Sequence, residues 1–171
     1  MTGAVIKVDA QYTEVLDALG RLAGQDGGLV SVGLKALGQA MLKSTRARFD
    51  AQRAPDGTAW VALNAEYAKG KRGTKILQGS GMAGGLLGSI TAQIYGNTLL
   101  IGTNKIYGRA HQFGVTIVPR NYPTLVFRMN GRLFWARKVT IPARPYLGLS
   151  AEDRAEIPLV IQDVLDAMIA P

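Results

Sequence analysis

The sequence contains no cysteine and only one histidine, His111. Without cysteine the chain cannot form disulfide bonds, use thiol chemistry or bind zinc through thiolates. A single histidine is also too few for a metal site built on imidazole ligands. We therefore expect no metal ion and no other cofactor.

Acidic residues are missing from the whole stretch between Glu66 and Glu152, although Lys and Arg recur through it. Residues 101–149 carry eight bases and no acid, whereas residues 150–171 carry five acids and one base. The formal net charge of the chain is +8. This asymmetry favours either a polyanionic partner or head-to-tail contact between copies of the chain.

Long hydrophobic runs of the membrane-spanning kind are also absent. Residues 76–104 carry no charge and could cross a bilayer by length alone, but seven glycines interrupt them. The N-terminus lacks the basic start and apolar run of a signal peptide. We therefore expect no membrane contact and synthesis in a cytoplasm. We also expect a single domain over residues 1–171, since 47% of the residues are hydrophobic and can form a core.

Apolar periodicity predicts helices near both ends of the chain. The first begins after Asp9 and ends before Gly24, and the second runs from about residue 29 to 51. Lys43, Arg46 and Arg48 would complement the dipole at the end of the second helix. Its apolar stripe consists of Val30, Leu34, Leu37, Met41, Thr45 and Phe49.

The last helix is expected to begin at Ser150, because Asp153 three residues later forms a capping-box pattern. Pro158 has no amide hydrogen, so it predicts either a kink or a new helix start.

Two β-hairpins are predicted in the middle of the chain. The first covers residues 88–103 and turns at Gly96-Asn97, which places Ile94 opposite Leu99 and Ala92 opposite Ile101. The second is a hairpin arm at residues 124–139 that turns at Asn130-Gly131, the preferred pair for a type I′ turn. Its register places Phe127 opposite Phe134 and Val126 opposite Trp135.

The expected fold class is therefore α+β. A small antiparallel β-sheet, formed by residues 88–103 and 115–142, packs against the long helix at 29–51. An N-terminal helix, a C-terminal helix and a protruding β-hairpin complete the fold. Pro119 and Pro123 separate the arm from the segment before it, which favours projection of the arm.

No residue pattern predicts catalysis. His111 has no carboxylate near it in sequence, and no nucleophile motif such as Gly-x-Ser-x-Gly is present. We expect His111 to make a structural hydrogen bond. The basic loop after residue 68 is either a solvated loop or a contact to phosphates, with Lys69, Lys71, Arg72 and Lys75 as candidate DNA-facing residues.

Several short motifs in a fixed order resemble the phage virion morphogenesis family, the tail-completion proteins of Mu-like tailed phages. They are Arg48-Phe49, Pro55-Asp56-Gly57 with Trp60 and Leu63, Ile76-Leu77 with Ser80-Gly81, Ile101-Gly102-Thr103-Asn104, Tyr107, His111-Gln112-Phe113-Gly114, and Ile141-Pro142-Ala143-Arg144-Pro145-Tyr146-Leu147-Gly148-Leu149-Ser150 with Asp153. Together they cover roughly residues 29–155. The chain departs from the pattern at Gly108, where a bulkier small residue is usual, and in a short insertion at residues 82–85.

The resemblance implies a non-enzymatic structural protein of the phage neck or tail top, acting in tail completion or head–tail joining. It implies a virion protein that is assembled in the host cytoplasm and forms a ring, with a hexamer favoured over a dodecamer. Its partners would be neighbouring neck and tail proteins and, without sequence specificity, the DNA that passes through the channel.

Two rival functions remain open at this point. One is a basic nucleic-acid-binding module, motivated by the acid-free stretch with its interspersed aromatic residues, Tyr107, Tyr122, Phe127, Phe134 and Trp135. The other is a hydrolase built on His111.

Two groups of residues are predicted to form sites. The stretches 101–114 and 141–150 should pack together as a structural centre, in which the Arg144 side chain joins them by hydrogen bonds to backbone carbonyls. The residues expected in this centre are Tyr107, His111, Phe113, Gly114, Arg144 and Pro145.

The second group is a subunit interface on the arm. One face of the hairpin has no expected cover within the chain, so a neighbouring subunit or neck protein should cover it. The alternative is that both faces are buried within one chain. The expected interface residues are Val126, Arg128, Leu133, Trp135, Arg137 and Lys138, facing acidic residues such as Glu152, Glu156 and Asp163.

Overall fold

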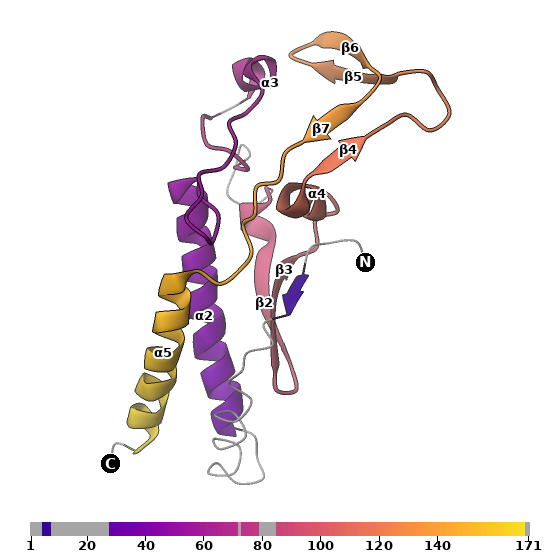
Figure 1. Cartoon of the computed structure of the whole chain (residues 1–171). Coiled ribbons are helices and arrows are strands. Elements are labelled where there is room, and N and C mark those ends of the chain that lie inside the picture. Colours follow the sequence, from indigo (N-terminus) through magenta and orange to yellow (C-terminus); the bar gives the residue numbers. More distant parts are fainter. Residues whose placement is uncertain (1–4, 8–27, 72, 79–84, 170–171) are drawn as a thin grey trace.

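The computed structural model describes residues 5–7, 28–71, 73–78 and 85–169 (Figure 1). The helix predicted from Asp9 to about residue 23, the candidate DNA-facing Arg72 and most of the insertion at residues 82–85 lie outside these ranges. The described residues combine helices with small antiparallel sheets, which confirms the α+β class.

Helix α2 (Gly28–Ala51) matches the long helix predicted from sequence. All six residues of its predicted stripe are buried, and Phe49 has no exposed surface. Burying one such apolar side chain stabilises the fold by about 1.5–3 kcal/mol. Figure 1 shows α2 lying beside helix α5 (Ala151–Ile169), so the stripe forms the centre of the core.

Helix α5 packs on α2 through Ile157 and Ile161, which are 4% and 7% exposed. It continues through Pro158, so the predicted new start at this proline is wrong. The ring of Pro158 lies on the exposed side, while the buried Ile157 and Ile161 hold the helix on both sides of it. Packing therefore compensates for the missing backbone hydrogen bond.

The first predicted hairpin consists of β2 (Ile90–Tyr95) and β3 (Thr98–Thr103), with the predicted register. Ile94 pairs with Leu99 and Ala92 with Ile101. A short strand that was not predicted, β1 (Val5–Lys7), pairs with the other edge of β3. The apolar face of this sheet packs on α2.

The 115–142 region does not extend this sheet, so that part of the prediction is wrong. Strands β4 (Val115–Ile117) and β7 (Val139–Ile141) form one two-stranded sheet, and β5 (Leu125–Met129) and β6 (Arg132–Ala136) form another. Figure 1 shows β4 and β7 leading away from the β2–β3 hairpin, which prevents edge pairing with it. The short helices are η2 (Leu87–Ser89), α3 (Ala65–Gly70) and α4 (Gly108–Phe113).

The β5–β6 hairpin has the predicted register, with Phe127 opposite Phe134 and Val126 opposite Trp135. Asn130 and Gly131 have φ angles of 49° and 78°. Positive φ at both central residues is what a type I′ turn requires, and this turn suits the twist of the two strands. In Figure 1 this hairpin lies at the end of the molecule farthest from α5. Below, the arm means residues 124–139.

Candidate functional site: a buried junction and an exposed arm

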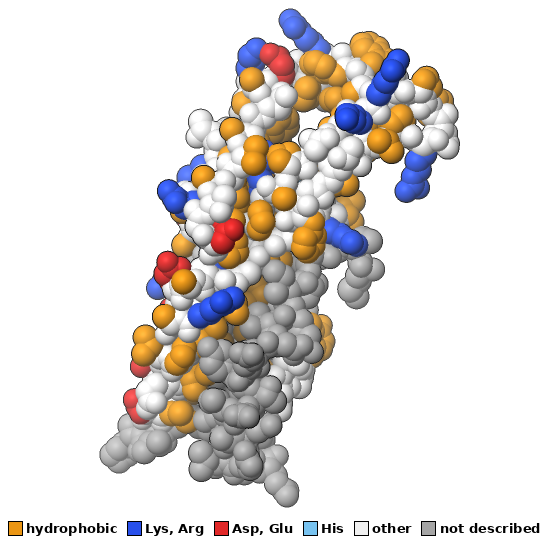
Figure 2. Space-filling view, in the orientation of Figure 1, with side chains coloured by type: hydrophobic (Ala, Val, Ile, Leu, Met, Phe, Trp, Pro, Cys, Tyr) orange, Lys and Arg blue, Asp and Glu red, His pale blue; other side chains and the backbone are white. Residues whose placement is uncertain are grey.

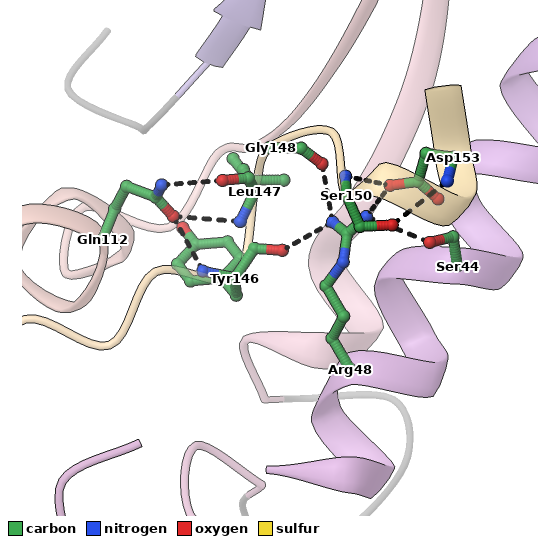
Figure 3. A network of polar contacts seen from close by, with 8 residues as sticks. All are labelled: Ser44, Arg48, Gln112, Tyr146, Leu147, Gly148, Ser150 and Asp153. Atoms are coloured by element: carbon green, nitrogen blue, oxygen red, sulfur yellow. Dashed lines mark hydrogen bonds and ion pairs between the residues drawn. The ribbon is translucent and has the colours of Figure 1, made fainter. Parts of the chain in front are cut away.

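Arg48 on α2 lies at the centre of a network of buried polar contacts, here called the junction (Figure 3). Its guanidinium forms an ion pair with Asp153 and donates hydrogen bonds to the Gly148 carbonyl at 2.7 Å and to Ser44 Oγ at 3.0 Å. Arg48 and Asp153 are 8% and 1% exposed. Because both charges are buried, each depends on the other for compensation.

Burial lowers the pKa of Arg48 from its ordinary value, while the nearby carboxylates of Asp153 and Glu152 oppose this shift. The guanidinium stays charged at every pH at which the protein is handled. Its predicted role at the dipole of the α2 C-terminus is therefore secondary to a specific ion pair with a helix 105 residues away in sequence.

Asp153 also begins helix α5. Its Oδ2 accepts a hydrogen bond from the Ser150 amide at 2.7 Å, and its own amide donates to Ser150 Oγ at 3.1 Å. These two bonds confirm the predicted capping box. One carboxylate thus fixes the first turn of α5 and attaches it to α2.

Gln112 on α4 extends the junction to the other side. Its Oε1 accepts hydrogen bonds from the amides of Tyr146 and Leu147, both at 3.0 Å, and its Nε2 donates to the Leu147 carbonyl at 2.9 Å. The Arg144 amide also donates to the His111 carbonyl at 2.7 Å. The stretches 101–114 and 141–150 therefore do pack together, as predicted.

The side chain that joins them is Gln112 rather than Arg144. Arg144 donates from Nε to the Val61 carbonyl at 2.8 Å and from its guanidinium to the Ala62 carbonyl at 3.0 Å. The prediction that Arg144 binds backbone carbonyls is right, but the predicted partner segment is wrong. Arg144 instead holds the extended segment that follows Trp60.

Three aromatic residues fill the space beside Arg48. The ring of Phe49 lies 5.3 Å from that of Trp60 and 5.6 Å from that of Tyr146, measured between centroids. Trp60 Nε1 donates to the Pro145 carbonyl at 2.8 Å, which places Pro145 in the junction as predicted. Edge contacts of this kind add about 0.5–1.5 kcal/mol each to the hydrophobic burial.

Two glycines lie where neighbouring segments pack too closely to leave room for a Cβ atom. A Cβ on Gly108 would lie 2.6 Å from Thr103 Cγ2 and 2.9 Å from the buried Tyr146 hydroxyl. In this chain the packing of Tyr146 and Thr103 therefore leaves no room for a side chain at position 108. Gly114 has φ of +72°, and its Cβ would lie 2.9 Å from the Ala143 amide nitrogen. No other residue fits there without backbone movement.

Two residues predicted for the structural centre lie at the surface, and within the part of the chain that the structure describes His111 lacks the side-chain hydrogen bond predicted for it. Tyr107 and Phe113 are 42% and 65% exposed, so their assignment to the centre is wrong. The short helix α4 directs Gly108 and Gln112 inward, one turn apart, and this turns Phe113 outward. His111 Nδ1 is buried without a hydrogen-bonding partner among the described residues, contrary to the structural hydrogen bond predicted for His111.

The surroundings of His111 disfavour protonation of its ring. Burial lowers its pKa below the ordinary value, and the positive charge of Arg144 lowers it further. The ring packs edge-on against Tyr107, with centroids 6.0 Å apart. No carboxylate hydrogen-bonds to it among the described residues, so nothing there orients it as a general base.

The root of the arm belongs to the same junction. Gly114 directly precedes β4, and the Arg144 amide that binds the His111 carbonyl follows shortly after β7. The ribbon formed by β4 and β7 therefore starts from the junction, as does α5 on the other side (Figures 1 and 3). The junction holds the root of the arm and the start of α5 in one fixed relation.

The two faces of the arm differ in exposure. On the inner face Phe127 and Phe134 stack with centroids 6.0 Å apart, and Phe127 lines a cleft of about 710 Å³ that also borders α3 and Arg144. The outer face carries Val126, Leu133 and Trp135, which are 58%, 46% and 64% exposed. The alternative in which the chain covers both faces of its own arm is therefore wrong.

Arg128 and Arg137 belong to this outer face, whereas Lys138 lines the cleft on the inner side. Arg128, Arg137 and Lys138 are exposed, and no ion pair between described residues involves them. Figure 2 shows blue Lys and Arg side chains at the arm end and red acidic side chains along α5. Glu152, Glu156 and Asp163, the predicted acidic partners, are exposed on α5. The structure thus separates the two sets within one chain.

The candidate DNA-facing lysines already have partners within the chain. Lys69 pairs with Glu66, and Lys75 Nζ lies 2.5 Å from Asp50 Oδ1. Lys71 Nζ donates to the carbonyls of Lys75 and Gln78 at 2.8 and 2.6 Å. These lysines hold their own loop together, which weakens the case that they form a free phosphate-binding surface.

Sequence reasoning missed Arg48, Gln112 and Asp153 as site residues. Arg48 lies seven residues after Met41, a spacing that returns to the buried side of a helix, so periodicity alone could have marked it as a buried cation. A buried cation in turn requires an anionic partner. Apart from its place in the motif His111-Gln112-Phe113-Gly114, nothing in the sequence marks Gln112, because an amide on a short helix has no distinguishing pattern.

The described ranges contain neither a metal-binding cluster nor a membrane-spanning helix. No group of three or more His, Asp or Glu side chains there could hold a metal ion. Of the helices that the structure describes, none is long and apolar enough to cross a membrane.

Comparison with known proteins agrees with the sequence motifs. Residues 10–166 match the phage virion morphogenesis family. The chain is 32% identical over 137 residues to Mu-like prophage FluMu G protein 2 of Haemophilus influenzae, covering 77% of this chain and 88% of the relative. It is also 32% identical over 126 residues to the putative capsid assembly protein G of Escherichia phage Mu, covering 72% and 71%. No solved structure matches.

These matches cover most of both chains. The chain belongs to the phage virion morphogenesis family.

Proposed function

We propose that this chain is a non-enzymatic structural subunit of the phage neck or tail top, which forms a ring as a tail-completion or head–tail joining protein. Family membership supports a role in phage assembly. The name of the phage Mu relative, a putative capsid assembly protein, points in the same direction. The protein would reside in the virion and be assembled in the host cytoplasm.

The observation that carries the proposal is the position of the junction between two exposed elements. Arg48, Asp153 and Gln112 hold the root of the arm and the first turn of α5 together. A ring with head-to-tail contacts closes only when the two contact surfaces of each subunit keep a fixed angle. In this proposal, motif residues such as Arg48, Gln112 and Asp153 keep the angle between the arm and α5 constant.

Charge and exposure support the same role. The arm is basic and apolar on its outer face, while the exposed side of α5 is acidic. Such opposed surfaces favour contact between different parts of neighbouring copies. We favour a hexamer over a dodecamer, with neck and tail proteins above and below the ring and DNA passing through it without sequence-specific contacts.

The proposal predicts a defined particle and a defined assembly defect. Purified protein should show a ring by electron microscopy and a mass that is an integer multiple of 18.3 kDa by native mass spectrometry. A phage lacking the chain should accumulate filled heads and separate tails, and joining should return when the chain is supplied in trans. Complete infectious virions in its absence would contradict the proposal.

A nucleic-acid-binding module is the second candidate, because Tyr122 and Trp135 are 78% and 64% exposed among arginines. Aromatic platforms beside basic residues bind single strands by stacking. Titration of the monomer with duplex and single-stranded DNA at several salt concentrations separates the two functions. Nanomolar binding with a steep salt dependence would favour this second candidate.

A further inference from the structure

Helix α5 carries an exposed stripe that the packing of the chain does not use. Glu152, Glu156, Leu159, Asp163 and Asp166 follow one another at intervals of four, three, four and three residues, so they lie along one face. All five are exposed, and Leu159 is 64% exposed. The stripe is therefore an apolar side chain with two acids on either side of it along the helix.

The opposite face of α5 accounts for the packing of the helix. Ile157 and Ile161 are buried against α2 and lie more than a third of a turn from Leu159 in the middle of the stripe, and the buried Asp153 lies between the two faces. Any partner of the α5 stripe must therefore come from another molecule.

The outer face of the arm has the complementary composition. Val126, Leu133 and Trp135 form its apolar part, and Arg128 lies on the same face opposite Leu133. Arg137 follows Trp135 at the next position of the same alternation, at the edge of this face. An exposed group of this kind, with aromatic and arginine side chains, has the composition of an interface hot spot.

The two surfaces do not meet within one chain. Figure 1 shows α5 and the β5–β6 hairpin at opposite ends of the molecule, with α2, α4 and the β4–β7 ribbon between them. Contact between them therefore joins one copy to the next, head to tail. Repeated in one direction, this contact builds rings or filaments, whereas two copies that exchange it reciprocally would form a two-fold dimer.

We infer that the outer face of the arm docks on the exposed α5 stripe of a second copy of the chain. Leu159 covers the apolar group of Val126, Leu133 and Trp135, and Arg128 and Arg137 face the acids on both sides of Leu159. The inference rests on the proposed ring function and names the two surfaces that would form the ring.

Another copy of the chain fits better than DNA as the occupant of the arm. DNA would match the arginines but would leave Val126 and Leu133 without an apolar cover, because protein–DNA interfaces are polar. DNA would also be repelled by the acidic α5 stripe. Docking between copies accounts for both exposed surfaces with a single contact. Its attraction should weaken at high salt because the charges lie at the rim.

The absence of native cysteine allows a direct test of the contact. Val126→Cys and Leu159→Cys are made separately and together, and each protein is treated with a short bifunctional maleimide. We expect the single variants to remain uncrosslinked alone and to give a dimer when mixed. The double variant should give a ladder of products that ends at the closed ring.

The controls in this experiment are pairs at other exposed positions. Val32→Cys lies on the exposed side of α2 and should not crosslink to Val126→Cys. Crosslinking of Val126→Cys to itself at the level of the mixture would indicate a symmetric contact and overturn the inference. The inference is also overturned if duplex DNA protects Val126→Cys from maleimide while the mixture of Val126→Cys and Leu159→Cys gives no dimer.

Charge reversal tests the polar part of the contact. Arg128→Glu with Arg137→Glu, or Glu156→Arg with Asp163→Arg, should each weaken self-association about tenfold or more. An equimolar mixture of the two double variants should assemble again, since the altered arm matches the altered helix. Lys35→Glu with Lys43→Glu makes the same charge change on the exposed side of α2 and should have little effect.

The outcomes separate this inference from the proposed function. A ring in the native mass spectrum without arm-to-α5 crosslinks would overturn the docking surfaces and leave the ring function intact. Crosslinks in the mixture without any closed ring would support the docking surfaces and contradict the ring. Recovery of assembly by the charge-reversed mixture supports both.

Discussion

The junction and the arm both contain arginines beside aromatic side chains, but these side chains differ in their partners. Arg48 is buried, and its ion pair and hydrogen bonds all lie within the chain. Arg128 and Trp135 on the arm are exposed. Satisfied buried groups stabilise the monomer, whereas exposed hot-spot residues contribute only when a partner covers them. Substitutions in the two regions should therefore change different measurements.

The largest effect on stability is expected from Asp153→Ala. The change leaves the Arg48 guanidinium buried without its partner and removes the capping box of α5. We expect the free energy of unfolding of the monomer to fall by about 3–5 kcal/mol. Urea denaturation of the dilute monomer measures this, with Glu156→Ala on the exposed side of the same helix as the control.

A loss similar to that of the control would show that the ion pair does not hold α5 to α2. A second variant sharpens the result. Arg48→Met in the Asp153→Ala background removes the unpaired charge and should recover part of the lost stability, because a buried apolar side chain carries no desolvation cost.

Gln112→Ala should have the next largest effect. It leaves the amides of Tyr146 and Leu147 and the Leu147 carbonyl buried without partners. We expect a loss of about 2–3 kcal/mol in the free energy of unfolding. Phe113→Ala at the adjacent, exposed position should cost less than about 1 kcal/mol. A larger loss of stability for Phe113→Ala than for Gln112→Ala would show that Phe113 belongs to the structural centre after all.

Two glycine substitutions should change stability in opposite directions. Gly108→Ala forces a Cβ against Thr103 and the Tyr146 hydroxyl and should destabilise the fold by about 1–3 kcal/mol. Gly33→Ala lies inside α2, where no atom of the described residues is within 4 Å of the new Cβ, and should stabilise the helix by about 0.5–1 kcal/mol. Thermal unfolding midpoints measured in parallel check both signs.

A smaller, pH-dependent effect is expected from His111. Its pKa in the folded protein lies below the ordinary value of 6.5, mainly because of burial, so the unfolded chain takes up the proton first on acidification. The stability from this site is present above about pH 6.5 and is lost as the pH falls toward the folded pKa. Unfolding free energies at pH 7.5 and 5.5 should differ more in the wild type than in His111→Asn.

The elements formed by local interactions could be predicted from the sequence. The stripe of α2, the capping box at Ser150 and the Asn130-Gly131 turn each depend on residues close together in the chain. Periodicity and turn chemistry are therefore enough to find them.

The parts that were missed depend on long-range contacts. The partner of Arg48 lies 105 residues away, and the partner carbonyls of Arg144 lie more than 80 residues away. β1 has only three residues, too few to show alternation. The separation of the 115–142 region from the β2–β3 sheet follows from where the junction directs the arm, which no local pattern encodes.

The measurement that tests the account most directly is the mass and stability of Trp135→Ser. Trp135 is 64% exposed on the outer face, so its loss should change the free energy of unfolding by less than about 1 kcal/mol. Self-association should be lost, because the apolar centre of the docking surface is gone. Native mass spectrometry should give the mass of one chain, 18.3 kDa corrected for the substitution, and urea denaturation of the same sample should show that this monomer is folded. The wild type should be assembled under the same conditions. An unfolded monomer, or a particle with the wild-type mass, would contradict the division between a stabilising junction and an assembling arm.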